Sequence, residues 1–269
     1  MSAISRVFER LGGEGALVAY VMGGDPDLAT SGAVIDAVVR GGADILEVGI
    51  PFSDPIADGK SIQAADVRSL ASGATPAKVL DLVSKARSRH PGVPVVVMTY
   101  YNILYSNGLE GFLERAKAHG VDGLIVPDLP FDEIEGYAPL ARRHGLDAVL
   151  LAAPTTSPSR MKAIAAHTSG FLYLVSLTGV TGARQAVGEG ALDLVRRVKR
   201  SAPRVPVAVG FGISAPEHVG AMLGAGADAV VVGSAIVDRV ERSEKDGTAA
   251  MLSAVEGYVR TMKAATKGA

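Results

Sequence analysis

Short apolar runs rich in β-branched residues recur along the whole chain. Their near-continuous hydrophobicity is typical of strands that are covered on both faces in a parallel sheet, rather than of the alternating strands of an exposed sheet. We expect eight strands from the runs LVAYVM (17–22), DILEVGI (44–50), VPVVVMTY (93–100), DGLIVPD (122–128), DAVLLA (147–152), FLYLVS (171–176), VPVAVGF (205–211) and DAVVVG (228–233).

Segments with helical spacing of apolar residues lie between these runs, among them AVIDAVVR, AKVLDLVSKAR, EGFLERAKAH, LDLVRRVKR and PEHVGAMLGAG. A weak repeat marks the joints, because GADILEVG, GVDGLIVPD, GLDAVLLA and GADAVVVG each place a helix-ending Gly two residues before an Asp that opens a strand. Strands alternating with helices predict a closed (β/α)8 TIM barrel, with a doubly wound open sheet as the alternative. No G-x-G-x-x-G follows the first strand to favour a dinucleotide-binding sheet.

Length and composition narrow the class of protein. The 269 residues suit one TIM-barrel domain, 1–269, and a net charge of −1 without a basic run gives no sign of a nucleic-acid or membrane surface. The absence of Cys excludes disulfides and thiol chemistry, and the five His residues lack ligand-like spacing, so no metal site is expected. The stretch from Met1 to Leu11 reads as a short extra N-terminal helix without a signal-peptide core. We therefore expect a cytoplasmic protein.

Glu47 interrupts the second predicted strand. Alternation places Ile45, Glu47 and Gly49 on one side of this strand and its Leu and Val neighbours on the other. A carboxyl buried there would have a raised pKa, which suits a group that gives and takes protons. The alternative is a structural carboxylate paired with a neighbouring residue of the barrel.

The loop PFSDPIADGKSIQ follows this strand and contributes Asp54 and Asp58. Its Pro and Gly residues restrict the backbone, so its acids would be held over the end of the barrel where βα loops gather. Solvated turn formation is the alternative for each acid alone. Together with Glu47, the loop predicts a pair of carboxyls at the mouth of the barrel.

Gly-rich segments follow the late strands: GVTGAR (179–184), GFGIS (210–214) and GS (233–234). Glycine lets backbone N–H groups approach an anion, and loops after strands seven and eight of such barrels frequently hold phosphate. Ser214 and Ser234 lie where helix N-caps are expected, and simple capping is the alternative reading. We expect a phosphate site here.

Tyrosines gather at predicted strand ends although aromatic residues make up only 5% of the chain. Tyr20, Tyr100 and Tyr101 end the first and third strands, and Tyr173 lies within the sixth, on the side of Phe171 and Val175. Such residues line apolar pockets while offering hydroxyls, although core packing explains each of them equally well. The residues thus indicate a barrel enzyme that uses acid/base chemistry on a phosphorylated, partly apolar substrate.

The motifs LEVGIPFSDPIADGKSIQ, DGLIVPDLP, VSLTGVTGAR, GFGIS and GSAIV together resemble the tryptophan synthase alpha subunit family, and the resemblance spans nearly the whole chain. It implies a lyase of tryptophan biosynthesis that cleaves indole-3-glycerol phosphate by a retro-aldol reaction into indole and glyceraldehyde 3-phosphate. It implies no metal and no organic cofactor on this subunit.

The resemblance also assigns residues. Glu47 matches the principal acid/base, and Asp58 matches a second carboxylate that faces the indole N–H. Tyr173 matches the residue near the glycerol portion of the substrate, and Thr181 matches the mobile loop after strand six. The phosphate loops are matched by Gly182, Gly212, Gly233 and Ser234. The indole pocket is matched by Tyr20, Ile62, Met98 and Tyr100.

The implied partner is the tryptophan synthase beta subunit, which carries pyridoxal phosphate and receives indole through a tunnel in an alpha2beta2 assembly. Pro51 and Asp54 resemble family positions near that interface. Three positions depart from the family pattern: Tyr20 stands where Phe is common, Leu177 where some members have Arg, and Lys60 where Pro is common. The expected effects are on pocket polarity, loop closure and the screening of Asp58.

Two other functions stay open at this stage. A barrel isomerase or synthase acting on a related phosphorylated indole precursor would need a differently placed acid or Lys. A binding subunit that only activates a partner enzyme would not need both Glu47 and Asp58. Product analysis with indole-3-glycerol phosphate separates these readings.

Overall fold

The computed structural model of the chain describes residues 1–175, 189–210 and 212–267. Within these ranges nine parallel strands form one sheet in the order β5-β4-β3-β2-β1-β9-β8-β7-β6. The strands are β1 (Ala16–Met22), β2 (Ile45–Gly49), β3 (Val95–Met98), β4 (Gly123–Ile125), β5 (Asp147–Val149), β6 (Leu151–Ala152), β7 (Leu172–Leu174), β8 (Val207–Val209) and β9 (Ala229–Val232).

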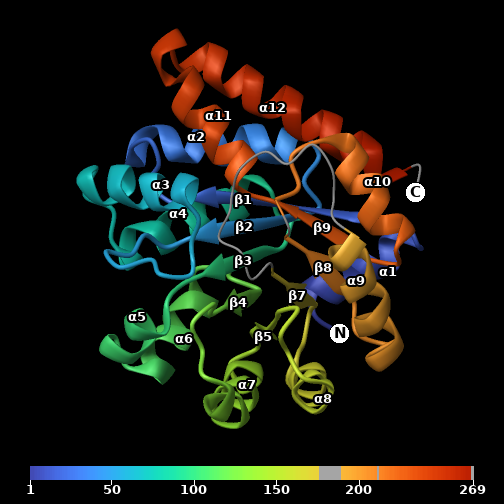
Figure 1. Cartoon of the computed structure of the whole chain (residues 1–269). Coiled ribbons are helices and arrows are strands. Elements are labelled where there is room, and N and C mark those ends of the chain that lie inside the picture. The colour runs from blue at the N-terminus through green and yellow to red at the C-terminus, as the bar shows by residue number, and fades with distance from the viewer. Residues whose placement is uncertain (176–188, 211, 268–269) are drawn as a thin grey trace.

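The two ends of this sheet meet at residue 150. β5 and β6 stand at opposite ends of the strand order, yet only Leu150 separates them along the chain. The Leu150 carbonyl accepts a hydrogen bond of 2.9 Å from the Tyr173 N–H, so the interruption stays within the sheet. The predicted strand 147–152 is therefore split in two, and the predicted (β/α)8 barrel is confirmed (Figure 1).

Helices surround the strands (Figure 1). Polar side chains start several of them: Asp27, Thr75 and Ser157 accept hydrogen bonds from the first-turn N–H groups of α2, α4 and α8. The helices are α1 (Ala3–Leu11), α2 (Leu28–Arg40), α3 (Lys60–Ala71), α4 (Pro76–Arg89), α5 (Tyr101–Ser106), α6 (Leu109–Ala118), α7 (Ile134–Arg143), α8 (Pro158–His167), α9 (Glu189–Ser201), α10 (Pro216–Gly224), α11 (Ser234–Ser243) and α12 (Thr248–Ala264), with 3₁₀ turns at Phe131–Glu133, Glu244–Asp246 and Ala265–Lys267.

Alternation along the strands separates two cores. Leu46 and Val48 of β2 face the surrounding helices in the larger core, whereas Ile45 packs inside the barrel. The register places Glu47 beside Tyr20 of β1 and Val96 of β3, so its side chain belongs to the inner face. The predicted split of β2 into an inner and an outer face is confirmed.

The Gly-x-Asp repeat has a structural role at the amino ends of the strands. Asp44, Asp122 and Asp228 each accept a hydrogen bond from a backbone N–H on the neighbouring strand, at 2.8, 2.9 and 2.7 Å. Each also lies near a cation, respectively Lys263, Arg87 and Lys199. In these three copies the Asp therefore ties its strand to a neighbour on the side opposite the βα loops, whereas Asp147 of the fourth copy has an Oδ2 without a hydrogen-bond partner among the described residues.

The first helix closes the amino end of the barrel. Ile4 and Val7 of α1 are buried with the inner residues of the strands, and the Phe8 ring meets the Phe171 ring edge-on at 6.4 Å. The Ile4 side chain packs over Gly123, where a Cβ would crowd it. The predicted short N-terminal helix is confirmed, and it serves as a plug.

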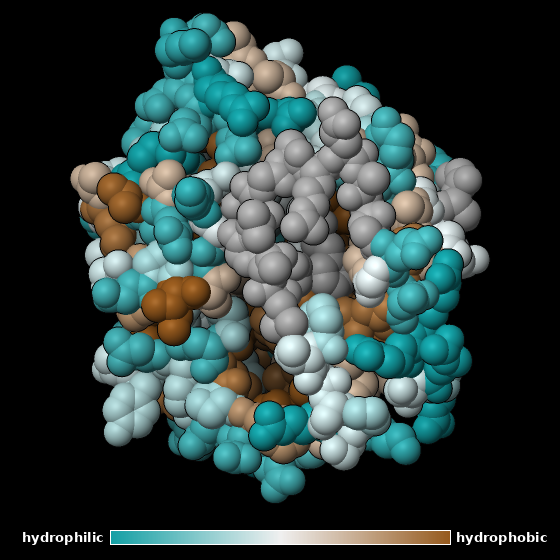
Figure 2. Space-filling model, in the orientation of Figure 1, coloured by the Kyte–Doolittle hydropathy of each residue, from teal (hydrophilic) through white to brown (hydrophobic). Residues whose placement is uncertain are grey.

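The surface in the orientation of Figure 1 is mostly hydrophilic, with a hollow near its lower centre where hydrophobic residues are visible (Figure 2). Among the residues described, no helix is both long enough and apolar enough to cross a membrane.

Candidate active site at the carboxyl ends of the strands

Glu47 is the most deeply buried acid of the inner face. Its side chain is 1% exposed, and its Oε2 atom has no hydrogen-bond partner within the described residues. Burial, and secondarily the charge of Asp58, raises the Glu47 pKa from 4.5 to about 8. The alternative considered from the sequence was a structural carboxylate paired with a neighbouring residue. Among the described residues, no cation or hydrogen-bond donor contacts the Glu47 carboxyl, so the structure does not support that alternative. Glu47 is therefore largely protonated at neutral pH.

Asp58 lies in the loop between β2 and α3, and the phenol of Tyr100 holds it. The Tyr100 hydroxyl donates a hydrogen bond of 2.8 Å to Asp58 Oδ2 and accepts one of 3.0 Å from the Ala57 N–H. Burial raises the Asp58 pKa to about 6, although the Tyr100 hydrogen bond acts in the opposite direction. Asp58 is therefore mainly a carboxylate at neutral pH.

The different surroundings give the two carboxyls different protonation states at neutral pH. Glu47 keeps its proton where no donor stabilises the charged form, whereas Asp58 loses its proton beside a phenol that does. Titratable groups whose surroundings push their pKa values apart are how a site holds an acid and an anion together. The arrangement can protonate one end of a bound molecule and stabilise positive charge at another.

An apolar wall stands next to these acids. Tyr20, Ile62 and Met98 belong to one cluster, together with Met22, Ala65 and Val237. Tyr20 crosses over Gly49, where a Cβ would overlap its hydroxyl, and a Cβ at Gly210 would lie 2.7 Å from the Tyr173 hydroxyl. Both tyrosines therefore pack against strand glycines inside the barrel, and Tyr173 tilts against Phe171 at 6.2 Å as the alternation predicts.

The late glycines lie at the carboxyl ends of β8 and β9. Gly212 has φ of +61°, a left-handed conformation that favours glycine. Gly233 is the N-cap of α11 and Ser234 its first residue, and no side chain caps that helix. The N–H groups of Ser234 and Ala235 have no acceptor among the described residues, whereas that of Ile236 bonds the Gly233 carbonyl, so the first two can donate to an anion. Thr181 and Gly182 lie outside the described residues, as do Leu177 and the rest of 176–188.

Serine capping, the alternative to phosphate binding at Ser214 and Ser234, is not what α10 and α11 show. Ala215 is the N-cap of α10 and Gly233 that of α11, so neither Ser214 nor Ser234 caps a helix with its side chain. Ser214 instead donates its N–H to His218 Nδ1 at 3.3 Å and accepts from the Tyr258 hydroxyl through its carbonyl. The Pro at the start of α10 shifts the helix boundary past the serine.

The two residues expected near a partner lie in the same loop as Asp58 but differ in exposure. Pro51 is buried, and Asp54 is exposed and accepts a hydrogen bond of 2.6 Å from the Ser53 hydroxyl. Ile56, which was not singled out from the sequence, is 85% exposed at the tip of the loop. A single exposed apolar side chain is common on protein surfaces and does not by itself mark a contact.

Sequence reasoning missed a third acid, Asp66 of α3. Its side chain is 2% exposed, and its Oδ1 accepts a hydrogen bond of 3.0 Å from the Phe52 N–H. Burial raises its pKa to about 7. A signal existed, because Asp66 follows Ile62 by four residues and so shares its buried face of the helix.

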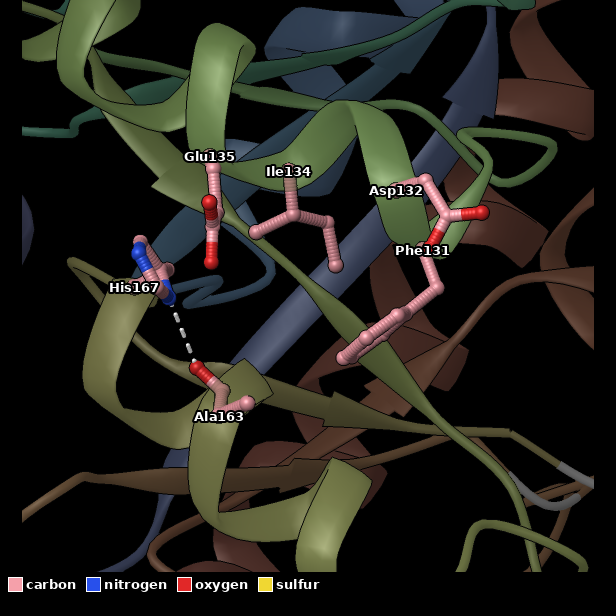
Figure 3. A pocket seen from close by; sticks show the side chains of 6 residues that line it. All are labelled: Phe131, Asp132, Ile134, Glu135, Ala163 and His167. Atoms are coloured by element: carbon pink, nitrogen blue, oxygen red, sulfur yellow. Dashed lines mark hydrogen bonds between the residues drawn. The ribbon is translucent and has the colours of Figure 1, made fainter.

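No group of three or more His, Asp or Glu side chains within the described ranges is arranged to hold a metal ion. A pocket of about 180 Å³ lies between the Phe131–Glu133 turn, α7 and α8 (Figure 3), and none of its lining residues is a predicted site residue. Asp132, Glu135 and His167 are among the residues that line it, and His167 Nδ1 lies 2.9 Å from the Ala163 carbonyl oxygen (Figure 3).

Comparisons with known proteins agree with this geometry. The family profile described as "Tryptophan synthase alpha chain" matches residues 9–267. A tryptophan synthase alpha chain from Methanoregula boonei is 46% identical over 267 residues, which is 99% of each chain. One from Prochlorococcus marinus is 49% identical over 241 residues, covering 89% of this chain and 87% of the relative.

Solved structures show the same likeness. The tryptophan synthase alpha chain from Legionella pneumophila is 32% identical, with a TM-score of 0.89 over 99% of this chain and 97% of that one. The A-subunit from Pyrococcus furiosus is 42% identical, with a TM-score of 0.85 over 93% and 98% of the two chains. The family profile and these relatives match nearly the whole chain, and the chain belongs to the tryptophan synthase alpha chain family.

Proposed function

We propose that Glu47 and Asp58 catalyse the reaction of this family in this chain, the cleavage of indole-3-glycerol phosphate to indole and glyceraldehyde 3-phosphate. The observation that carries the proposal is a buried Glu47, protonated at neutral pH, next to an ionised Asp58 and an apolar wall. The wall of Tyr20, Ile62 and Met98 suits a flat heteroaromatic ring.

The chemistry follows from the two protonation states. Glu47 donates its proton to carbon 3 of the indole, and the positive charge that develops on the ring nitrogen is stabilised by the Asp58 carboxylate. A base removes the proton of the glycerol hydroxyl next to this carbon. The carbon–carbon bond then breaks, its electron pair restores the aromatic ring, and the hydroxyl carbon becomes the aldehyde. Glu47, ionised after its donation, is a carboxylate that can take this proton.

The remaining site residues position the substrate in this proposal. Tyr173 lies inside the barrel near Glu47 and would contact the glycerol portion, and Tyr100 orients Asp58 beside the ring. Gly212, Gly233 and Ser234 would hold the phosphate with the free N–H groups at the start of α11. Gly182 and Thr181, outside the described residues, are proposed for the phosphate and for the loop that covers the substrate.

The test is an indole-release assay on the purified chain with indole-3-glycerol phosphate. We expect Glu47→Gln to lower the rate by on the order of 10²-fold or more, the usual loss for a positioned acid/base. Exposed Glu110 provides the matched control, and Glu110→Gln should keep the wild-type rate. Near-normal turnover by a folded Glu47→Gln protein would reject the assignment.

The family name implies a beta subunit as partner. We propose an alpha2beta2 assembly in which the partner carries the pyridoxal phosphate and receives indole, with Pro51 and Asp54 close to the contact. Mixing the chain with a beta subunit should produce a larger species in sedimentation and faster indole formation. A cytoplasmic location and a single domain over 1–269 stay predictions.

A further inference from the structure

Asp66 is a buried carboxyl that the proposed reaction does not use. It lies within α3, its Oδ2 has no hydrogen-bond partner among the described residues, and no described cation pairs with it. The nearest cation along the helix, Arg68, is engaged by Asp25 at 2.7 Å and Glu241 at 3.0 Å. Burying such a group costs free energy that no ion pair offsets here.

The one hydrogen bond that Asp66 makes to another described residue reaches the loop that carries Asp58. Its Oδ1 accepts the Phe52 N–H at 3.0 Å, eight residues before α3 begins at Lys60. The N-cap of α3, Gly59, offers no side chain to hold the incoming chain. Asp66 therefore fixes the start of the β2–α3 loop from inside the helix that follows it.

The contact continues from Phe52 to Asp58 through one ring. The Phe52 and Tyr100 rings stack with their centroids 4.8 Å apart and their planes 23° apart. The Tyr100 hydroxyl donates to Asp58 Oδ2 and accepts the Ala57 N–H, so the same tyrosine holds both ends of the loop. A displacement of Phe52 would move the Tyr100 ring, and with it the hydroxyl that holds Asp58.

We propose that Asp66 is a positioning residue for the lyase reaction: by holding the Phe52 N–H, it keeps Phe52 stacked on Tyr100 and thereby sets the place of the Asp58 carboxylate. This inference rests on the role of Asp58 in the proposed function. The positioning role requires an acceptor oxygen on the Asp66 side chain for the Phe52 N–H, and it does not require that side chain to be charged. The raised pKa of about 7 agrees with this, because a carboxyl that is partly neutral near pH 7 still offers an acceptor oxygen.

The experiment compares Asp66→Ala with Asp66→Asn in the indole-release assay. We expect Asp66→Ala to lower kcat about tenfold with KM changed less than about threefold, because a shifted Asp58 loses stabilisation of the transition state more than ground-state binding. Asp66→Asn keeps an acceptor oxygen at the same place and should bring kcat back to within about threefold of wild type.

Ser69→Ala is the matched control. Ser69 lies one turn further along α3, is fully buried and donates a hydrogen bond of 2.6 Å to the Gly23 carbonyl, which is outside the Phe52–Asp58 contact. We expect this variant to melt at a lower temperature but to keep the wild-type kcat. Equal losses of kcat in Ser69→Ala and Asp66→Ala would mean that α3 acts only through stability, and would overturn the proposal.

Amide hydrogen exchange at Phe52 gives a readout without activity. Exchange should be faster in Asp66→Ala and unchanged in Ser69→Ala, with Asp66→Asn close to wild type. Wild-type kcat in Asp66→Ala, or no recovery in Asp66→Asn, overturns the inference while the lyase assignment stands if Glu47→Gln is inactive. If the wild-type chain releases no indole, the proposed function fails, and unchanged Phe52 exchange in Asp66→Ala then overturns the positioning role as well.

Discussion

Glu47 and Asp58 carry the same functional group, and their surroundings alone separate them. Burial without a donor raises the pKa of Glu47 to about 8, whereas the Tyr100 hydroxyl limits the rise for Asp58 to about 6. The reactive state, with Glu47 protonated and Asp58 ionised, is therefore most populated between these two values. The two groups also feel each other's charge, so an experiment reports values of the pair.

The pH dependence of kcat/KM should accordingly be bell-shaped, falling below about 6 as Asp58 takes up a proton and above about 8 as Glu47 loses one. Tyr100→Phe removes a hydrogen bond that lowers the Asp58 pKa. The acid limb should then move to higher pH while the alkaline limb stays, because Asp58 is ionised at that pH in either protein and Tyr100 does not act on the Glu47 pKa. Steady-state kinetics between pH 5 and 9 measure both limbs.

A Tyr100→Phe protein with an unmoved acid limb would show that this phenol does not hold Asp58 in solution. An acid limb that persists in Asp58→Asn would show that another group produces it.

Sequence reasoning reached Glu47 because strand alternation is local. Alternation places Glu47 on the same face of the strand as Ile45 and Gly49 without reference to the rest of the chain. The hydrogen bond between Tyr100 and Asp58 joins residues that are 42 positions apart, and the one between Asp66 and Phe52 joins residues that are 14 positions apart. Both fix the loop after β2, whose path no sequence periodicity encodes. These contacts needed the folded chain.

At the scale of elements, the Gly-x-Asp repeat could be predicted to mark boundaries between helices and strands. Its hydrogen bonds to neighbouring strands could not be predicted. The sequence shows where helix ends and strand begins, whereas the acceptor role depends on which strand lies alongside. α3 escaped notice because its sequence KSIQAADVRSLA has few large apolar residues, and its buried face is built from Ile62, Ala65, Asp66 and Ser69. The break at Leu150 follows from barrel closure and has no sequence signal that we can identify.

Asp44 tests the structural role of the repeat. Its Oδ2 accepts from the Leu17 N–H at 2.8 Å and from Lys263 at 2.7 Å, and both partners are largely buried. Asp44→Ala leaves a buried N–H and a cation without partners, so we expect a loss of about 2–4 kcal/mol in the free energy of unfolding. Thermal melting should show it, with kcat unchanged because Asp44 lies at the opposite end of the barrel from Glu47.

Asp193→Ala is the comparison for Asp44→Ala. Asp193 pairs with Arg196 while 73% exposed, and exposed pairs contribute about 0–1 kcal/mol. Equal melting temperatures for the two variants would contradict the bridging role of the repeat.

For the whole molecule, the eight apolar runs and the segments between them were enough to predict the barrel. Each run is buried on both faces, which few architectures other than a helix-covered parallel sheet allow. The resemblance added the reaction, because no periodicity can name a substrate. The positions of the loops after β2 and β8 depend on long-range packing, and this is where the sequence was least informative.

Glu47 also links the reaction to the stability of the molecule. Its pKa is 4.5 when unperturbed and about 8 in the fold, so between these values the folded chain holds a proton that the unfolded chain has lost. The contribution of Glu47 to stability is thus complete below about 4.5 and is lost as the pH rises to about 8. One such group gives a slope of about 1.4 kcal/mol per pH unit.

Glu47→Gln lacks this titration. Its free energy of unfolding, measured in urea at several pH values, should gain on the wild type progressively from pH 5 to pH 8. Parallel curves for the two proteins would show that the Glu47 carboxyl is not held neutral by the fold.

The closure of the amino end of the barrel by α1 has a consequence for how substrate enters and products leave. With Ile4, Val7 and Phe8 filling the amino end, the described part of the chain leaves the rim above the strands as the way in and the way out. The substrate and its products have to pass through that same opening, one after the other. A protein bound at the rim would therefore control both substrate entry and product release. The overall rate would then depend on that protein as much as on the acids inside the barrel.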